Sequence, residues 1–209
     1  MDYDIAIIGY GPVGAMAANM FGSSGLNIVV IEPKKEIWNI PRAVALDGQA
    51  QRIFQSCGIS NNIPVKPIDG LTFINKKGQQ IVYVDFTDHS TPNGYSETVG
   101  FSQPNLEKTL REKAESYKNI TFKLGSSLSN LVATENNNEL TVINNLTKET
   151  EIVSSKYLLA CDGADSFVRK SLGITMHDYN CDQDWVVVDY LVDDRYKILD
   201  KSRYQICDY

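Results

Sequence analysis

The chain has 209 residues, of which 43% are hydrophobic and 22% charged, and its formal net charge is −6 at pH 7. This length can bury a core in one large domain or in two small ones. The acidic balance and the lack of a basic cluster argue against nucleic acid as the main partner. The four cysteines lack the spacing of a metal site, so we expect free thiols, a reducing compartment and no bound metal.

The N-terminus lacks the features of a targeting segment. No basic segment precedes the first apolar run, and Gly9 and Pro12 break that run. A signal peptide needs a basic start and an uninterrupted apolar stretch, and a membrane-spanning helix needs about 20 apolar residues. We therefore expect a cytoplasmic protein that is neither secreted nor embedded in a membrane.

A glycine-rich turn follows the first predicted strand, Ile5–Ile8. Its order, Gly-x-Gly-x-x-Gly, is typical of dinucleotide-binding turns. The first glycine permits a tight turn, the second lets the backbone approach a pyrophosphate, and the third allows close packing of the next helix. The helix N-terminus offers unpaired N–H groups and a partial positive charge to phosphate. We assign the pyrophosphate to the residues of this turn: Gly9, Gly11, Pro12, Val13 and Gly14.

A helix and a second strand follow the turn. Apolar residues at helical spacing predict the helix and its buried face, namely Val13, Met16, Ala17, Met20 and Phe21. The strand Ile28–Ile31 ends at Glu32, where an acidic side chain can accept hydrogen bonds from an adenosine ribose. A nucleotide-free βαβ unit is the alternative, but strand, turn, helix, strand and acid in this order favour a dinucleotide.

Arg42 and Asp47 lie on the connection to a second helix, which is predicted around Ala50 and Phe54 and ends at Gly58. Near the carboxyl edge of a sheet, Arg42 could contact a pyrophosphate or an anionic substrate. A solvated arginine explains the same position equally well. Asp47 could act as a base, but an aspartate there more often caps the helix.

A hairpin and a third helix come next. Residues 71–74 and 81–86 predict the two strands of the hairpin, and residues 87–98 predict a surface loop. Pro104 opens a helix with apolar residues along one side. The amide of Gln103 can cap this helix or bind the polyol chain of a ligand, and capping is the more common role.

Strands dominate the rest of the chain. Four are predicted at residues 120–124, 127–133, 139–143 and near 152. The apolar run Tyr157–Cys161 predicts a buried strand. Two further strands are predicted at residues 185–192 and 203–207. Together these elements indicate an α/β fold in which a β-meander inserted between Rossmann strands adds an antiparallel layer.

Asp162 stands between the strand Tyr157–Cys161 and a short helix bearing Ser166 and Arg169. One interpretation is a routine strand–turn–helix connection. The other is a second contact with the dinucleotide, because open α/β sheets bind ligands at the carboxyl ends of their strands. The residues alone leave both interpretations open.

Four motifs in this order resemble the group A FAD-dependent aromatic monooxygenases, which share the p-hydroxybenzoate hydroxylase fold. The motifs are Gly9–Gly14 with Glu32, Pro41–Ala43, Gln103-Pro104, and Ala160–Arg169. The likeness is strongest to the aromatic hydroxylases typified by 3-(3-hydroxyphenyl)propionate hydroxylase, and it covers essentially the whole chain.

The resemblance implies a Rossmann-like FAD-binding domain that uses NADH or NADPH as reductant and O₂ to hydroxylate a phenolic compound. It implies that the glycine turn holds the FAD pyrophosphate and that Glu32 binds the adenosine ribose. Arg42 would lie near the pyrophosphate, and Gln103 would reach the ribityl or ring region. Asp162 would be tied to both FAD and the pyridine nucleotide. No catalytic residue is assigned.

The resemblance also implies a division of the chain. Residues 1–175 would form the FAD-binding domain, with residues 63–100 contributing to the substrate side. Residues 176–209 would begin a truncated substrate-binding domain with a mixed sheet. Members of the family continue further and carry a Gly-Asp flavin motif, for which this sequence has no counterpart. We therefore predict the N-terminal portion of a hydroxylase.

Two other functions compete with this prediction. One is a catalytically silent FAD- or nucleotide-binding module that acts with a partner chain supplying the missing C-terminal part. The other is an NAD-dependent dehydrogenase that uses Glu32 for NAD. The dehydrogenase is disfavoured because His89 and His177 are isolated and form no catalytic constellation.

Overall fold

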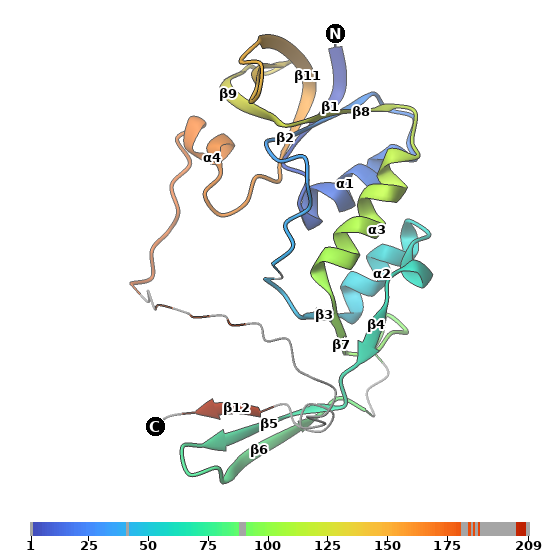
Figure 1. Cartoon of the computed structure of the whole chain (residues 1–209), viewed down its shortest axis with the longest axis vertical. Helices are drawn as coiled ribbons and strands as arrows, with labels where there is room; N and C mark the ends of the chain where they lie inside the picture. The colour runs from blue at the N-terminus through green and yellow to red at the C-terminus, as the bar shows by residue number, and fades with distance from the viewer. Residues whose placement is uncertain are drawn as a thin grey trace.

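A six-stranded sheet forms the upper end of the molecule in Figure 1. The computed structural model describes residues 2–40, 42–87, 91–180, 184, 186 and 188, and the backbone of 204–207. The strand order is β8-β2-β1-β11-β10-β9. The strands are β1 (Asp2–Ile8), β2 (Ile28–Glu32), β8 (Ile120–Leu124), β9 (Ser126–Ala133), β10 (Asn138–Asn144) and β11 (Thr150–Ala160).

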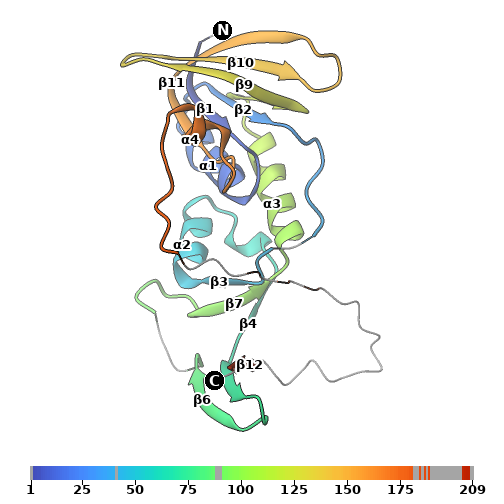
Figure 2. The same cartoon turned by 90° about the vertical axis from the view of Figure 1, so that its left-hand side faces the viewer.

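The sheet combines a parallel part with an antiparallel meander. Strands β8, β2, β1 and β11 run parallel, whereas β10 is antiparallel to both β9 and β11. The long strand β11 belongs to both parts, because Thr150–Ser155 pairs with β10 and Ser154–Ala160 pairs with β1. Figure 2 shows the meander across the top of the molecule. This arrangement confirms the predicted α/β fold with an inserted β-meander.

Both faces of the central strands β1 and β2 are covered. Ile5 and Ile7 of β1 pack in a core with helices α1 (Pro12–Gly22), α2 (Gly48–Ser56) and α3 (Gln103–Glu115). Ala6 and Ile8 point to the opposite face and pack in a second core with the meander. Side chains alternate between the two faces of a strand, so the unbroken apolar run of β1 serves two cores.

Helix α1 buries a different face from the one predicted. Val13 is 69% exposed and Met20 is 49% exposed. Met16, Ala17 and Phe21 pack only at the edge of the core. The buried residues are Gly14, Ala15, Ala18, Asn19 and Gly22. Hydrophobic spacing failed here because close packing against neighbouring backbone and rings selects small side chains rather than large apolar ones.

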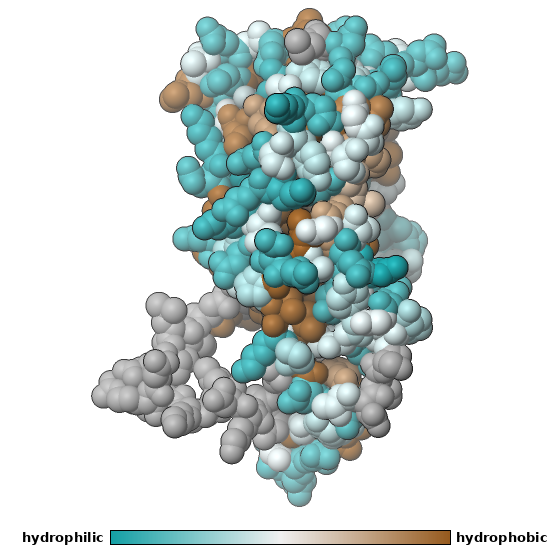
Figure 3. Space-filling view, turned by 90° about the vertical axis from the view of Figure 1, so that its right-hand side faces the viewer, coloured by the Kyte–Doolittle hydropathy of each residue, from teal (hydrophilic) through white to brown (hydrophobic). Residues whose placement is uncertain are grey.

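Contacts at two small or polar residues of α1 illustrate this packing. A Cβ added to Gly22 would lie 2.5 Å from the ring of Tyr117. The Asn19 Nδ2 donates hydrogen bonds to Ala15 O and to Leu110 O, both at 2.8 Å, and so ties α1 to α3. On the side of the molecule that carries α2 and α3, the surface is mostly hydrophilic (Figure 3).

Two smaller sheets lie toward the other end of the molecule (Figures 1 and 2). The sheet β3-β7-β4 joins Ala45–Asp47, Thr98–Phe101 and Val65–Pro67, and the sequence did not predict it. The sheet β12-β5-β6 joins Tyr204–Cys207, Gly70–Asn75 and Gln80–Asp85, and it confirms the predicted hairpin. Two short helices, η1 (Ser60–Asn62) and α4 (Phe167–Ser171), complete the described elements.

The predicted burial of Tyr157–Cys161 is wrong, although the strand exists as the end of β11. Tyr157 is 69% exposed. The pairing with β10 ends at Ser155, so beyond that residue β11 pairs only with β1 within the described part of the chain. An apolar run therefore indicated the strand correctly but not its surroundings.

Some predictions concern residues outside the described part. The predicted strand at 185–192 falls mostly there, as do Pro41, His89 and Cys181. The division between residues 1–175 and 176–209, with residues 63–100 on the substrate side, therefore stays a prediction. Within the described residues, no helix has both the length and the apolarity to cross a membrane.

Candidate cofactor-binding site

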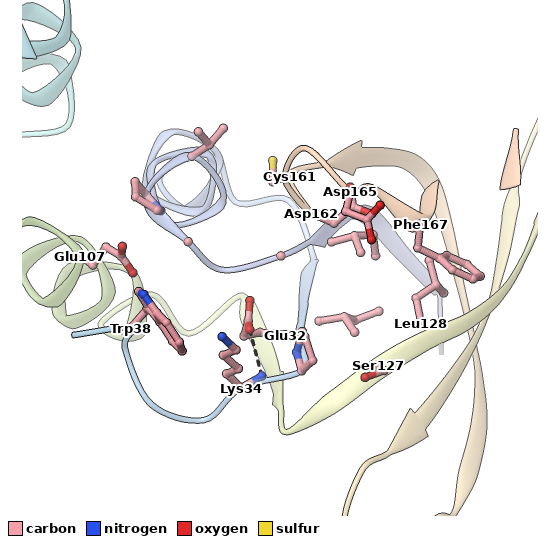
Figure 4. A pocket seen from close by; sticks show the side chains of 18 of the residues that line it. Glu32, Lys34, Trp38, Glu107, Ser127, Leu128, Cys161, Asp162, Asp165 and Phe167 are labelled. Carbon is pink, nitrogen blue, oxygen red and sulfur yellow. Dashed lines mark hydrogen bonds between the residues drawn. The ribbon is translucent and has the colours of Figure 1, made fainter. Parts of the chain in front are cut away.

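A cavity of about 600 Å³ opens where β1, β2 and β11 end. Its walls come from the glycine turn, the segment after β2, helix α3, strand β9 and the turn before α4 (Figure 4). Most of the predicted site residues line it: Gly9, Gly11, Pro12, Val13, Glu32, Arg42, Gln103 and Asp162. Gly14 is not among the lining residues but packs directly beneath the turn. The fold thus brings together segments that are more than a hundred residues apart in the sequence.

The three glycines of the turn have different surroundings. Gly9 has a φ of +94°, and a Cβ there would lie 2.4 Å from Cys161 O. A Cβ on Gly14 would lie 2.0 Å from Gly9 O. A Cβ on Gly11 would meet nothing within 4 Å, so open space borders this residue. Gly9 and Gly14 are therefore required by the chain itself, whereas Gly11 leaves room for a ligand.

Glu32 fixes the turn from the end of β2. This buried carboxylate accepts a hydrogen bond from Tyr10 N at 2.7 Å through Oε2 and one from Lys34 N at 2.9 Å through Oε1. Figure 4 draws the bond to Lys34. Each carboxylate oxygen has two lone pairs, so Glu32 keeps capacity for ligand hydroxyls.

A cationic wall follows β2. The Lys34 Nζ lies 3.9 Å from the centroid of the Trp38 ring, and the Arg42 Cζ lies 5.9 Å from it. All three side chains line the cavity. Arg42 is exposed and also borders the cavity, so solvation and a ligand contact are compatible at this position.

Gln103 does not cap α3, so the more common of its two expected roles is wrong. The N-cap is Ser102, and Gln103 is the first residue of the helix. The buried Gln103 Oε1 accepts hydrogen bonds from Arg42 N at 2.8 Å and Ala43 N at 3.0 Å, while Nε2 donates to Glu107 Oε1 at 2.9 Å. Through these two hydrogen bonds, the Gln103 side chain holds the backbone segment that carries Arg42.

Sequence reasoning missed two further residues of α3 that line the cavity, Glu107 and Arg111. They are 3% and 7% exposed, respectively. Both follow Gln103 at intervals of four residues, so the three polar side chains share one face of the helix. The four-residue spacing of these polar residues is visible in the sequence. The helix, however, was predicted from its apolar positions, which lie on another side of it.

Asp162 has a structural role in the connection to α4. Its Oδ1 accepts a hydrogen bond from Ser166 Oγ at 2.7 Å, and its Oδ2 accepts one from Val168 N at 3.1 Å. Ser166 is the N-cap of α4 and accepts from Arg169 N at 2.9 Å. This is the routine strand–turn–helix connection, and it also places Asp162 at the cavity, so a ligand contact there stays a prediction.

Next to Asp162, the thiol of Cys161 is half-buried at the cavity. Burial, and secondarily the charge of Asp162, raise the pKa of this thiol above its ordinary value. Cys161 therefore stays protonated at neutral pH and is a poor nucleophile.

The far wall of the cavity comes from β9 and α4. Figure 4 shows Ser127, Leu128, Asp165 and Phe167 there, opposite Trp38 and Glu107. None of these residues was predicted. Leu128 and Phe167 give part of this wall an apolar character that suits a planar ring, and Asp165 adds an exposed carboxylate to it.

Two smaller predictions can also be compared with the structure. Asp47 caps α2, because its Oδ1 accepts a hydrogen bond from Ala50 N at 2.7 Å; the favoured interpretation is confirmed. Cys57 and Cys161 are free. Among the described residues, no group of His, Cys, Asp and Glu side chains could hold a metal ion.

The sequence matches a known family, the FAD binding domain, over residues 2–206. The chain belongs to this family. The resemblance that its motifs indicated is therefore confirmed at the level of the family. FAD is the cofactor of this family, so the cavity should suit the chemistry of FAD.

Relatives of this FAD binding domain include 3-(3-hydroxy-phenyl)propionate/3-hydroxycinnamic acid hydroxylases from Escherichia coli O8 (strain IAI1) and O81 (strain ED1a). Each is 30% identical over 188 residues, which are 88% of this chain and 33% of the relative. The chain thus spans about a third of the length of these relatives.

Solved structures support the same fold. The flavin-dependent monooxygenase PieE, in complex with FAD and substrate, has a TM-score of 0.73 at 22% identity, covering 83% of this chain and 32% of PieE. The p-nitrophenol 4-monooxygenase PnpA from Pseudomonas putida DLL-E4 has a TM-score of 0.76 at 19% identity, covering 82% of this chain and 44% of PnpA.

The cavity of this FAD binding domain fits the chemistry of FAD. The open space at Gly11 borders the N-terminus of α1, where a diphosphate finds unpaired N–H groups. Glu32 lines the same cavity and has lone pairs that its two backbone hydrogen bonds leave unused. The Arg111 Nε is buried without a hydrogen-bond partner in the described residues, and Arg111 lines the cavity, so an uncompensated positive charge lies beside it.

Proposed function

We propose that the chain binds FAD in this cavity and represents the N-terminal portion of an NAD(P)H- and O₂-dependent hydroxylase of phenolic compounds. Family membership supports the cofactor, and the names of the relatives support the reaction and the substrate class. The observation that carries the proposal is the open cradle at Gly11 between the glycine turn, Glu32 and Arg42.

The proposed roles follow the positions of the residues. The turn, including Gly9, Gly11, Pro12, Val13 and Gly14, would hold the diphosphate. Glu32 would bind the adenosine ribose, and Arg42 would neutralise a phosphate. Gln103 would orient the Arg42 segment and keep one amide hydrogen for the ribityl chain. Asp162 would hold the turn beside the cofactor.

Bound FAD would supply the transfer of electrons from NADH or NADPH to O₂. The residues of this chain would bind it, orient it and shield it from water. The relatives are about three times as long as this chain, so the substrate side of a complete enzyme requires residues beyond the FAD cavity. We place the division near residue 175 and expect the protein in the cytoplasm.

A titration with FAD tests the proposal. We expect the purified chain to quench FAD fluorescence saturably and to become yellow after desalting. Gly11→Ala and Gly11→Val form a graded series, because a side chain at Gly11 fills the cradle without meeting the protein. We expect little loss of affinity for alanine and about tenfold or more for valine, with unchanged circular dichroism. Equal FAD affinity in all three proteins would contradict the proposed location.

A catalytically silent FAD-binding module that acts with a partner chain is the second candidate. The cavity has the features of a nucleotide site, and no catalytic residue is assigned in it. Oxidation of NADH or NADPH by the FAD-loaded chain, with and without a phenolic acid such as 3-(3-hydroxyphenyl)propionate, separates the two functions. A hydroxylated product supports the enzyme. FAD binding without oxidation supports the module.

A further inference from the structure

Arg111 is a buried cation at the cavity that the predicted site does not include. Its side chain comes from the C-terminal half of α3, is 7% exposed and lines the cavity. A buried charge is costly unless it is paired and hydrogen-bonded. Among the described residues no carboxylate forms an ion pair with Arg111, and its Nε has no hydrogen-bond partner.

The guanidinium group holds the glycine turn through Tyr10. The Arg111 Nη2 donates a hydrogen bond to Tyr10 O at 2.8 Å, and its Cζ lies 4.5 Å from the centroid of the Tyr10 ring. Tyr10 is fully buried, and its backbone N–H is held by Glu32. An anion on one side and a cation on the other therefore fix this residue of the turn.

The contact with Tyr10 O also affects Gly11. The Tyr10 carbonyl and the Gly11 N–H belong to the same peptide group. A cation at the carbonyl oxygen draws electron density from that group, so the N–H becomes a stronger donor. Gly11 is the residue at which the structure leaves open space, so the strengthened donor belongs to the wall of the cavity.

We propose that Arg111 is a positioning residue for a diphosphate at the glycine turn, acting through the Tyr10–Gly11 peptide and through a charge that no carboxylate among the described residues neutralises. This inference rests on the proposed function, because it concerns the same cavity. It adds that the positive charge for the diphosphate comes partly from α3, a helix that is remote in sequence from the turn.

A purely structural clamp is the competing explanation. In that case Arg111 would only tie α3 to the turn and to the segment after β2, where its Nη1 lies 3.5 Å from Lys35 O. A clamp supports every ligand of the cavity equally. A charge directed at the diphosphate supports only ligands that carry phosphate, and this difference can be measured.

ADP and adenosine are the two probes, because they differ only in the diphosphate. Arg111→Gln keeps a donor for Tyr10 O but removes the charge, and Arg111→Lys keeps the charge. Lys108→Met removes an exposed cation of the same helix and is the control. We expect Arg111→Gln to weaken ADP binding by about tenfold or more. Adenosine affinity should stay within about twofold, and Arg111→Lys should recover most of the ADP affinity.

Equal weakening of ADP and adenosine in Arg111→Gln, or unchanged ADP affinity, would overturn the inference. If Arg111→Gln fails to fold, the Nε–H resonance of Arg111 in the unmodified chain decides. We expect this resonance to shift with ADP and not with adenosine, and no shift with ADP overturns the inference. If the unmodified chain binds FAD and Arg111→Gln binds ADP normally, only this inference is wrong and the proposed function stands. Binding of neither FAD nor ADP by the unmodified chain removes the proposed function as well.

Discussion

Several polar residues around the cavity have two roles. Each forms hydrogen bonds that hold the backbone, and each would also contact the proposed ligand. Glu32 binds two backbone N–H groups, and Gln103 binds two others on the segment of Arg42. Asp162 holds the start of α4. Substituting any of them therefore changes the shape of the cavity together with its chemistry. A substitution at one of these residues therefore cannot separate the effect on cavity shape from the effect on ligand binding. Clearer tests use residues that do not hold the backbone of the cavity in this way.

Cys161 is such a residue and gives a test of pH dependence. Its pKa is raised by burial and by the charge of Asp162, so at a given pH less thiolate is present than for an ordinary cysteine. We expect alkylation of Cys161 by iodoacetamide, followed by peptide mass spectrometry, to require a higher pH than alkylation of a cysteine in an unstructured reference peptide. FAD should slow labelling at Cys161 only. Labelling of Cys161 at neutral pH that is faster than labelling of the reference peptide would contradict a half-buried thiol beside Asp162.

At the scale of elements, helix α1 packs closely against its neighbours because most residues on its buried face have small side chains. Gly14 and the small residues beside it let the helix start directly on the glycine turn, and the large side chains of Val13 and Met20 are exposed. Helix α2 depends instead on a polar cap from Asp47. Each device predicts a distinct effect on stability.

Gly14→Ala should destabilise the protein. Its Cβ would lie 2.0 Å from the backbone oxygen of Gly9, which cannot move without disturbing the turn. We expect the free energy of unfolding in urea to fall by about 1–3 kcal/mol. Gly11→Ala is the matched control, with open space at its Cβ, and should cost less than about 1 kcal/mol. Similar losses in both variants would argue against this packing.

Asp47→Ala should cost about 1 kcal/mol of unfolding free energy, because Ala50 N loses its acceptor at the start of α2. Asp47→Asn keeps an acceptor oxygen and should retain most of the stability. Urea denaturation of the two variants gives the comparison. A larger effect on FAD affinity than on stability would instead favour a role for Asp47 toward the ligand.

At the scale of the whole molecule, stability is concentrated at the central sheet. Strands β1 and β2 have buried side chains on both faces, whereas every residue of β6 is exposed. The cavity opens at the edge of the buried sheet, so its walls begin from the most firmly packed backbone. The hairpin sheet at the other end has few such contacts.

Hydrogen exchange should reveal this difference. We expect backbone amides of β1 and β2 to exchange only on global unfolding, because both neighbouring strands and both cores protect them. Amides of β5 and β6 should exchange faster, through local opening. Measurement by mass spectrometry on the unmodified chain suffices. Equal protection at both ends would show that the hairpin sheet is covered in solution.

The sequence by itself determined the local order of the site: strand, glycine turn, helix, strand and acid, with the hairpin and the meander in the right places. These features depend on neighbouring residues, so periodicity and turn chemistry suffice to predict them. Only the tertiary structure decided which face of α1 is buried, that Gln103 binds the Arg42 segment, and that Arg111 lies behind the turn. These outcomes depend on backbone distances between segments far apart in the chain, which no local pattern encodes.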